Sequence, residues 1–477
     1  MAENFAQAEA LKPAATAATT DKLQEDARAA APAADSTPAA QAAEKPLKGT
    51  LAKPALGEEY YTVPGVLGAQ DRIQVTKAQE NAAFGELAIQ VNQIQKIARQ
   101  KAEEAAKAAG SSDKPELHRG FHAKQVAGMI GDFKIFDDDT FKQKMNEQYG
   151  DRIKKEHVDI MALHDRAKQG LFKEPTTYHI LARYSNGVGV LRPDKETDVR
   201  GFAFKVLERA DGTALPGGGS NSGTQDFLMT NREVPMGKDA YEFMDFARFN
   251  ATLPGKALPD LLKIEGLGNT FSKDHPRVKE QILGLAKHEL RGVTSLACEN
   301  YWGGSPYRLG SDEQGSQLIK FLVKPHDSKE PYAFKRIHNP FSSTSENFLR
   351  DDLKSRNAKG EIKYDFYIQF QTDAEKTPAE DALNTWSEEE SLPILIGEIS
   401  LYENQNFDTK EKEDFVSNLS LTPWHYTEGH KPAGSINRVR EGVYGGSAAY
   451  RVNGTPLKAV TDTSAREVEK VFGPFKK

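Results

Sequence analysis

The most informative stretch of the sequence is NRVREGVYGGSAAYR, residues 437–451. If Arg440 to Tyr444 form one helical turn, the guanidinium and the phenol lie on one face of the helix, because residues four apart are neighbours there. A cation held at that position favours the phenolate form, a hard anionic donor that suits ferric iron. The residues alone leave a second interpretation open, a surface helix end that carries a buried tyrosine.

Two earlier segments combine histidine, arginine and serine. In HRGFHAK, residues 118–124, two histidines four apart could bind a metal on one helix face. However, Gly120 lies between the two histidines and the sequence shows no third ligand. The segment is therefore better interpreted as a solvated loop that leads into a strand. In LARYSN, residues 181–186, strand geometry puts Arg183 and Ser185 on the same side. An edge strand with an exposed arginine is the alternative.

The N-terminal part of the chain divides into two predicted regions. Residues 1–58 are rich in Ala, Pro, Lys, Glu and Thr and contain few large apolar side chains, which predicts a disordered arm. Within 59–114, a long amphipathic helix is predicted from Asp71 to Ala109, followed by a linker. Its apolar face should pack on the main domain or on a second subunit. That face carries Phe84, Leu87, Val91, Ile94 and Ile97.

Residues 115–455 are predicted to form one domain, with a short tail at 456–477. Alternating patterns predict strands at 178–185, 202–206, 226–230, 318–323, 364–371 and 394–402. Helices are predicted between them, at 240–250 and 277–290. Since strands and helices do not alternate regularly, an antiparallel sheet or closed barrel with helical insertions fits better than a doubly wound parallel sheet.

Composition narrows the classes of partner. The 477-residue chain has a net charge of −6, from 63 Lys and Arg against 69 Asp and Glu, so bulk charge gives no support to nucleic-acid binding. The single cysteine, Cys298, excludes an intramolecular disulfide framework and fits a reducing compartment, here expected to be the cytoplasm. Neither a signal peptide nor a membrane span is expected from the sequence.

Together with RGFAFK, residues 200–205, these segments resemble the haem catalases. The family's motifs His-Ala-Lys, Arg-aromatic-Ser, Arg-Gly-Phe-Ala-x-Lys and Arg-x3-Tyr-x6-Arg occur here in the same order, between about Leu117 and Val452. The last motif is the most specific, because both arginine spacings around the tyrosine match. The resemblance implies an α+β fold, a catalase-like antiparallel β-barrel with surrounding helices and a haem buried against the barrel.

The same resemblance implies roles for individual residues around a haem b. Tyr444 would be the axial iron ligand, as in catalases generally, and Arg440 would keep it ionised. His122 would be the distal acid/base, oriented by Ser185. A polar residue that polarises peroxide is expected at Asn231, with Thr230 as the alternative. The haem propionates would pair with Arg119, Arg183 and Arg451. The face of the haem would contact Phe204 and Phe243.

Three departures from typical catalases indicate the minimal, catalase-related branch of the family. Phe121 stands where a smaller valine is usual, Gly445 and Gly446 follow the tyrosine, and only a short tail follows Arg451. We therefore expect a haem enzyme that decomposes hydrogen peroxide or small organic peroxides. A fatty-acid-hydroperoxide enzyme and a haem-binding protein with little turnover are the alternatives. The resemblance leaves an organic reductant and a homo-oligomer open as partners.

Overall fold

The computed structural model describes residues 77–108, 110, 119–196, 198–216, 223–240, 242–243, 246–247, 292–311, 316–326, 345–452 and 463–476. The arm predicted at 1–58, His118 and the helix predicted at 277–290 lie outside the described residues, and only parts of the helix predicted at 240–250 lie within them. The long N-terminal helix is present as α2 (Lys77–Ala108).

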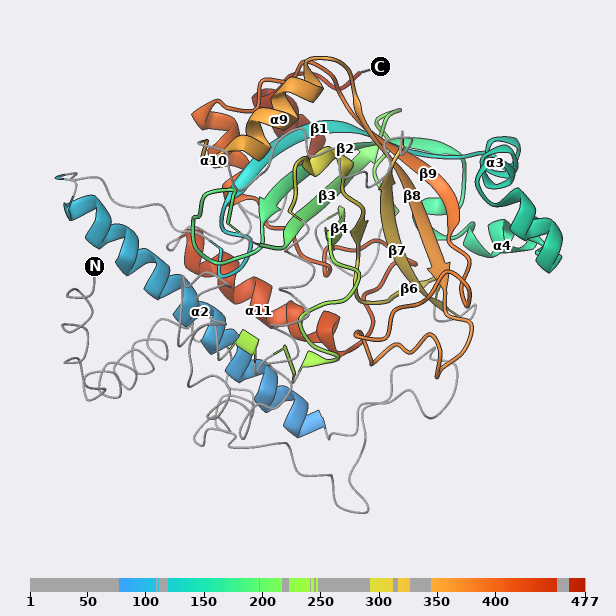
Figure 1. Ribbon diagram of the computed structural model, residues 1–477, viewed down its shortest axis with the longest axis horizontal. Helices are drawn as coiled ribbons and strands as arrows, with labels where there is room; N and C mark the ends of the chain where they lie inside the picture. Colours follow the sequence, from blue (N-terminus) through green and yellow to red (C-terminus); the bar gives the residue numbers. More distant parts are fainter. Residues whose placement is uncertain are drawn as a thin grey trace, which may run out of the picture.

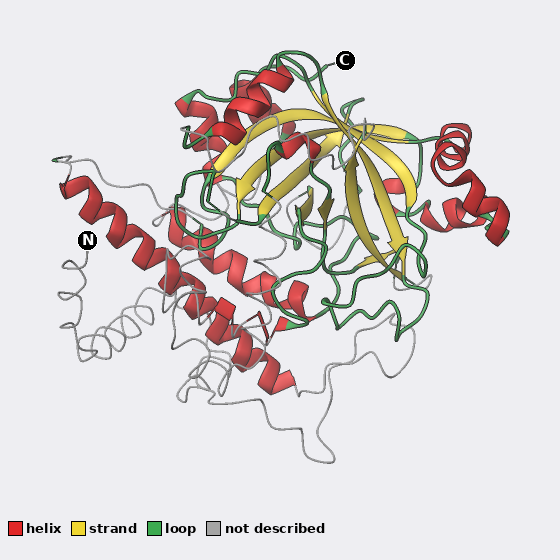
Figure 2. Ribbon diagram, in the orientation of Figure 1, coloured by secondary structure: helices red, strands yellow, loops and turns green. Residues whose placement is uncertain are grey.

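Antiparallel strands close into a barrel in the centre of the molecule (Figures 1 and 2). Around the barrel the order is β5-β4-β3-β2-β1-β9-β8-β7, and pairing of Tyr301 with Val323 joins β5 to β7. The short strand β6 adds to β7. The strands are β1 (Gln125–Ile135), β2 (Thr176–Asn186), β3 (Arg200–Arg209), β4 (Gln225–Thr230), β5 (Tyr301–Trp302), β6 (Tyr307–Leu309), β7 (Gln317–Pro325), β8 (Ile362–Phe370) and β9 (Ile394–Leu401).

Aromatic side chains fill the inside of the barrel. Phe133, Phe204, Phe227 and Phe366 form one buried cluster, with Phe204 stacked on Phe227 at a centroid distance of 4.8 Å. Phe133 meets Phe366 at the same distance of 4.8 Å. Because alternate residues of each strand point inward, the barrel is a packed core and leaves no room for a cofactor at its centre.

Helices cover the outside of the barrel. Figure 1 shows α2 and α11 lying side by side along one flank, and contacts between the two helices agree with this view. Within the described residues, no helix is long and apolar enough to cross a membrane. The other helices are α3 (Asp138–Glu156), α4 (Ile160–Ala167), α9 (Phe348–Asn357), α10 (Lys410–Asn418), α11 (Ser435–Val452) and α13 (Ala465–Phe472).

The antiparallel barrel predicted from the sequence is confirmed, and each predicted strand overlaps an observed one. β1 was expected only as the start of a strand after residue 124. Its sequence, QVAGMIGDFKI, is buried on both faces and contains two glycines, so neither alternation nor strand propensity marks it. The region predicted as a tail contains α13, which begins with a capping box between Ser464 and Glu467.

Candidate active site

A cavity with a volume of about 280 Å³ lies between the barrel wall and helices α2 and α11. One part of its lining comes from the segment around His122 and from strands β2, β3 and β4. Another part comes from α11, the helix that carries Tyr444. The sequence-predicted residues that line this cavity are Arg119, His122, Arg183, Ser185, Thr230, Phe243, Arg440, Tyr444 and Arg451.

The backbone around His122 is held in an unusual conformation. His122 has a φ of 56°, in the left-handed region that side-chain-bearing residues rarely adopt. Its N–H donates to Gly187 O at 2.7 Å, and its carbonyl accepts from Arg183 Nη2 at 2.8 Å. These bonds fix a strained residue at the cavity, and such conformations persist only where the surroundings determine them.

The His122 ring is oriented by a hydroxyl and kept neutral by its surroundings. Its Nδ1 lies 3.1 Å from Ser185 Oγ. Burial, with the positive charges of Arg183, Arg119 and Arg440, lowers the pKa of His122 to about 3. Gly201 must be a glycine here, because a Cβ at that position would lie 2.6 Å from both His122 Nδ1 and Ser185 Oγ. The imidazole is therefore a neutral base at ordinary pH.

Tyr444 and Arg440 lie one turn apart on α11, as the spacing predicted. The Arg440 guanidinium carbon is 6.0 Å from the centre of the Tyr444 ring. Arg440 Nη1 donates to Asn437 Oδ1 at 3.0 Å. Phe121 and Phe243 meet edge to face at 5.8 Å and belong to the same apolar cluster as Tyr444. The phenol thus lines an apolar cavity with a cation nearby.

Arg119, Arg183 and Arg451 gather at the cavity. Burial, and then the positive charge of Arg451, lower the pKa of Arg183 to about 9, and burial lowers that of Arg451 to about 10. The pKa of Arg119 is lowered by burial and then by the charges of Arg183 and Arg451.

We call these three residues the arginine cluster. Their hydrogen-bonding groups are only partly satisfied. Arg119 donates to the carbonyls of Ser417 and Leu419. Among the residues that the structure describes, Arg183 Nε and Arg451 Nε are buried and have no hydrogen-bond partner. In the described part of the chain none of the three forms an ion pair with a carboxylate. Buried cations in this state fit an anionic ligand that supplies the missing acceptors.

Two residues expected at the site lie elsewhere. Asn231 follows the end of β4 and turns away from the cavity: its Oδ1 accepts from Arg200 N and its Nδ2 donates to Glu299 Oε2, both at 2.8 Å. Thr230, the alternative, lines the cavity instead. Phe204 is also misplaced by the prediction, because its side chain points into the barrel and stacks on Phe227.

Several lining residues were not predicted from the sequence. Apolar side chains of α2 form part of the cavity wall, and so do valines of the loop between β2 and β3. Asp198, next to the RGFA motif, accepts from Gly187 N at 2.9 Å and Val188 N at 3.1 Å, and burial raises its pKa. The apolar face of the predicted N-terminal helix could have indicated that the α2 side chains line the cavity. The apolar lining residues of α2 are Leu87, Val91 and Ile94, and those of the loop are Val188, Val190 and Val199.

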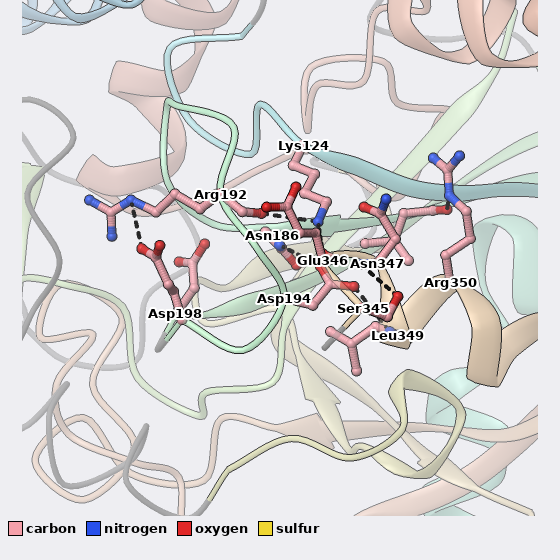
Figure 3. A network of polar contacts seen from close by, with 12 residues as sticks. Lys124, Asn186, Arg192, Asp194, Asp198, Ser345, Glu346, Asn347, Leu349 and Arg350 are labelled. Atoms are coloured by element: carbon pink, nitrogen blue, oxygen red, sulfur yellow. Dashed lines mark hydrogen bonds and ion pairs between the residues drawn. The ribbon is translucent and has the colours of Figure 1, made fainter. Parts of the chain in front are cut away.

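A polar network beside the cavity anchors the His122 segment (Figure 3). Lys124 Nζ donates to Asp194 Oδ1 at 2.7 Å and to the carbonyls of Arg192 at 3.0 Å and Glu346 at 2.8 Å. Asp194 also accepts from Asn186 Nδ2 at 3.1 Å. The lysine of the His-Ala-Lys motif thus fastens the segment to the loop before β3 and to the start of α9.

A separate group of side chains could hold a metal, but it lies away from the cavity. Over the described ranges, His326, Asp365 and Glu398 form the group with suitable ligand atoms. His326 Nδ1 is 2.7 Å from Asp365 and 3.4 Å from Glu398, so the three already form ion pairs. None of them lines the cavity.

Comparisons with known proteins agree with this architecture. A fungal catalase matches with 18% identity and a TM-score of 0.52, over 76% of this chain and 63% of the fungal chain. A bacterial catalase matches with 16% identity and a TM-score of 0.50, over 90% of this chain and 71% of the bacterial chain. This chain therefore spans less than two thirds of the fungal protein. A search among curated proteins found no significant relative.

At such identities the structural likeness shows the fold alone. The sequence profile of the catalase family, by contrast, matches residues 157–455, more than half of the chain. This match includes Arg183, Ser185 and Tyr444 but begins after α2 and the His122 segment, which the fold brings to the same cavity. The chain belongs to the catalase family.

Proposed function

We propose that this protein is a haem-dependent enzyme that decomposes hydrogen peroxide or small organic peroxides. One observation carries the proposal: a single cavity is lined by a partly buried, neutral histidine, by a tyrosine beside an arginine, and by the arginine cluster. In other words, a candidate acid/base, a candidate iron ligand and candidate partners for carboxylates converge on one space. Family membership supports the same class of reaction.

The residues present fit a haem b. Tyr444 would hold the iron through its phenolate oxygen, and Arg440 would favour that anion. The propionates would take up the unsatisfied donors of Arg183 and Arg451, together with Arg119, because a guanidinium matches a carboxylate in shape and charge. A bound haem would supply the iron redox chemistry that cleaves the O–O bond.

The protein's own contribution is to move protons. Because its pKa is lowered to about 3, His122 is neutral at ordinary pH and can accept a proton from one peroxide oxygen and return it to the other. The departing oxygen then leaves as water. Ser185 fixes Nδ1, so we assign the transfer to Nε2. The Thr230 hydroxyl donates to Arg232 O at 3.1 Å and keeps its lone pairs for a substrate O–H.

The aliphatic part of the cavity favours peroxides with an apolar substituent as additional substrates. Leu87, Val91 and Ile94 present only carbon to this space. Transformation of a fatty-acid hydroperoxide is the second candidate function that such a wall supports. Product analysis with a fatty-acid hydroperoxide and with cumene hydroperoxide distinguishes the two, since rearrangement keeps both oxygens in the product and peroxidase cleavage does not.

Oxygen evolution from hydrogen peroxide tests the main proposal. The full chain is loaded with hemin, freed of excess, and assayed with a Clark electrode and, in parallel, with an aromatic reductant. Turnover in either assay above that of free hemin is expected. Stoichiometric haem binding without turnover of any peroxide would contradict the proposal and would favour a haem-binding protein instead.

A further inference from the structure

Helix α2 contacts both sides of the cavity although it lies outside the stretch that matches the catalase family. It spans Lys77–Ala108, whereas the match begins at residue 157. Its side chains Leu87, Val91 and Ile94 line the cavity. Beyond this lining, α2 touches the segment that carries His122 and packs along the helix that carries Tyr444.

The first contact is between Val91 and Gly120, two residues before His122. Val91 is 2% exposed, and a methyl group at Gly120 would overlap Val91 Cγ1 and lie 3.1 Å from the Val91 carbonyl oxygen. Interiors packed this closely transmit small displacements rather than absorbing them. The position of α2 therefore sets how near the His122 segment can come to the cavity.

The second set of contacts ties α2 to α11. Arg438 Nε donates to Glu80 Oε1 at 2.6 Å and Arg438 Nη2 to Glu80 Oε2 at 3.2 Å, a bidentate pair between groups that are 11% and 3% exposed. Arg438 Nη1 also donates to Glu380 at 2.9 Å. About one helical turn after Tyr444 on α11, the backbone carbonyl of Ser447 accepts a hydrogen bond from Gln95 Nε2 at 3.2 Å.

Buried bidentate pairs of this kind fix register more than they add stability. Arg438 lies six residues before Tyr444 on one rigid helix, so fixing Arg438 fixes the axial position and rotation of the phenol. Val91 lies between Glu80 and Gln95 on α2. The same helix, α2, thus makes both the contact with Gly120 and the contacts with α11.

We propose that α2 is a clamp that sets the separation of the His122 segment from the Tyr444 helix, with Val91 and Glu80 as positioning residues. The inference rests on the proposed function for its catalytic consequence, but the clamp itself is a property of the polypeptide. Val91 would act on His122 through Gly120, and Glu80 on Tyr444 through Arg438. Neither residue is assigned a contact with the reacting atoms.

The contact at Gly120 is tested by a double-mutant cycle. Gly120→Ala should lower kcat for peroxide about tenfold by displacing His122, since misplacements near 1 Å cost up to about 10²-fold. Adding Val91→Ala to Gly120→Ala makes room and should recover most of that loss, while KM changes little. Strictly additive losses in the double variant would overturn the positioning role of Val91.

The contact at Arg438 is tested by the release of hemin to an excess of a haem-free acceptor globin. Glu80→Gln keeps the shape and removes the charge, and should speed release about tenfold or more. Glu80→Asp should restore part of the retention. Glu104→Gln is the matched control, because it removes the charge of an exposed glutamate on the same helix. Equal release rates for Glu80→Gln and the control would contradict the clamp.

Hydrogen exchange in the apo-protein separates this inference from the proposed function. Val91→Ala should speed exchange of the His122 and Ala123 amides, which bond to Gly187 O and Val188 O, and Glu104→Gln should not. Unchanged exchange at these amides in Val91→Ala would refute the clamp even if the enzyme is active. Altered exchange in a protein without peroxide turnover would keep the clamp and reject the proposed function.

Discussion

Two charged regions contact the segment around His122, and they differ in how their charges are satisfied. Around Asp194, a buried carboxylate meets Lys124 at 2.7 Å, and its second oxygen accepts from Leu349 N at 3.0 Å (Figure 3). In the arginine cluster, the hydrogen bonds found within the described residues go to carbonyls, and two Nε groups have no acceptor there.

The difference separates scaffold from site. Burial of a charge is tolerated where partners surround it, and is costly where they do not. Both oxygens of the Asp194 carboxylate have partners within the polypeptide, so loss of this carboxylate should weaken the fold. The arginine cluster is incomplete, so it should gain from a bound dianion and its loss should weaken binding. Each prediction below tests one side of this contrast.

The largest effect is expected at His122, the residue that both regions position. His122→Ala should retain hemin and lose peroxide cleavage by about 10²–10⁴-fold, the usual contribution of a positioned acid/base. Initial rates at equal haem loading measure this. Ser185→Ala, which leaves the imidazole in place without its orienting hydroxyl, should lose less. Wild-type rates for His122→Ala would remove it from the mechanism.

Asp194→Ala should destabilise the apo-protein by about 3–5 kcal/mol, because it leaves the Lys124 ammonium partly buried and unpaired. Urea unfolding followed by circular dichroism gives this free energy. A surface control is Glu390→Gln, which removes an exposed pair with Lys376 and should change stability by less than about 1 kcal/mol. Equal effects of the two substitutions would contradict the scaffold role of the Asp194 network.

Arg183→Gln and Arg451→Gln should have the opposite profile. Each should weaken hemin binding about 10- to 100-fold, the range for hydrogen bonds to charged groups, while the apo-protein unfolds at the same or a higher urea concentration. Fluorescence quenching during hemin titration measures the affinity. A clear loss of apo-protein stability with unchanged affinity would place these arginines in the scaffold instead.

The smallest effect concerns acid stability. Burial lowers the pKa of His122 and of His430 to about 3, whereas an unfolded histidine titrates near 6.5. The unfolded chain therefore takes up protons first as pH falls, and stability is lost from about pH 6.5 toward 3. Between pH 7 and 5.5 each histidine should cost roughly 1 kcal/mol.

His430→Gln should reduce this pH dependence of the unfolding free energy by about half of the histidine contribution, whatever its effect on absolute stability. The Leu171 N–H donates to His430 Nε2 at 2.8 Å, which explains why protonation is resisted there. An unchanged slope between pH 7 and 5.5 would show that His430 titrates normally in the folded protein.

Local patterns explain which parts of the fold and of the site could be predicted. Alternation predicted strands that overlap β2, β3 and β7. The resemblance to haem catalases, which rests on local motifs, implied that His122, Ser185 and Tyr444 share a site, and all three line the cavity. Both the alternation and the motifs depend on neighbours in sequence.

The failures depend on contacts that are remote in sequence. Asn231 and Thr230 differ by one position, and only the point where β4 ends decides which of them lines the cavity. Phe204 obeys strand alternation but serves the barrel core. The role of α2 could not be predicted, because Glu80 and Arg438 are paired across 358 positions of the chain.

The central claim is that Tyr444 holds a haem iron within this cavity, and the absorption spectrum of the hemin-titrated full chain tests it most directly. The wild type should bind one equivalent of hemin with a high-spin ferric spectrum of phenolate ligation. Tyr444→Phe should lose most of the haem or shift the Soret band. Identical haem content and spectra for the two proteins, or a wild type that stays colourless, would contradict the account.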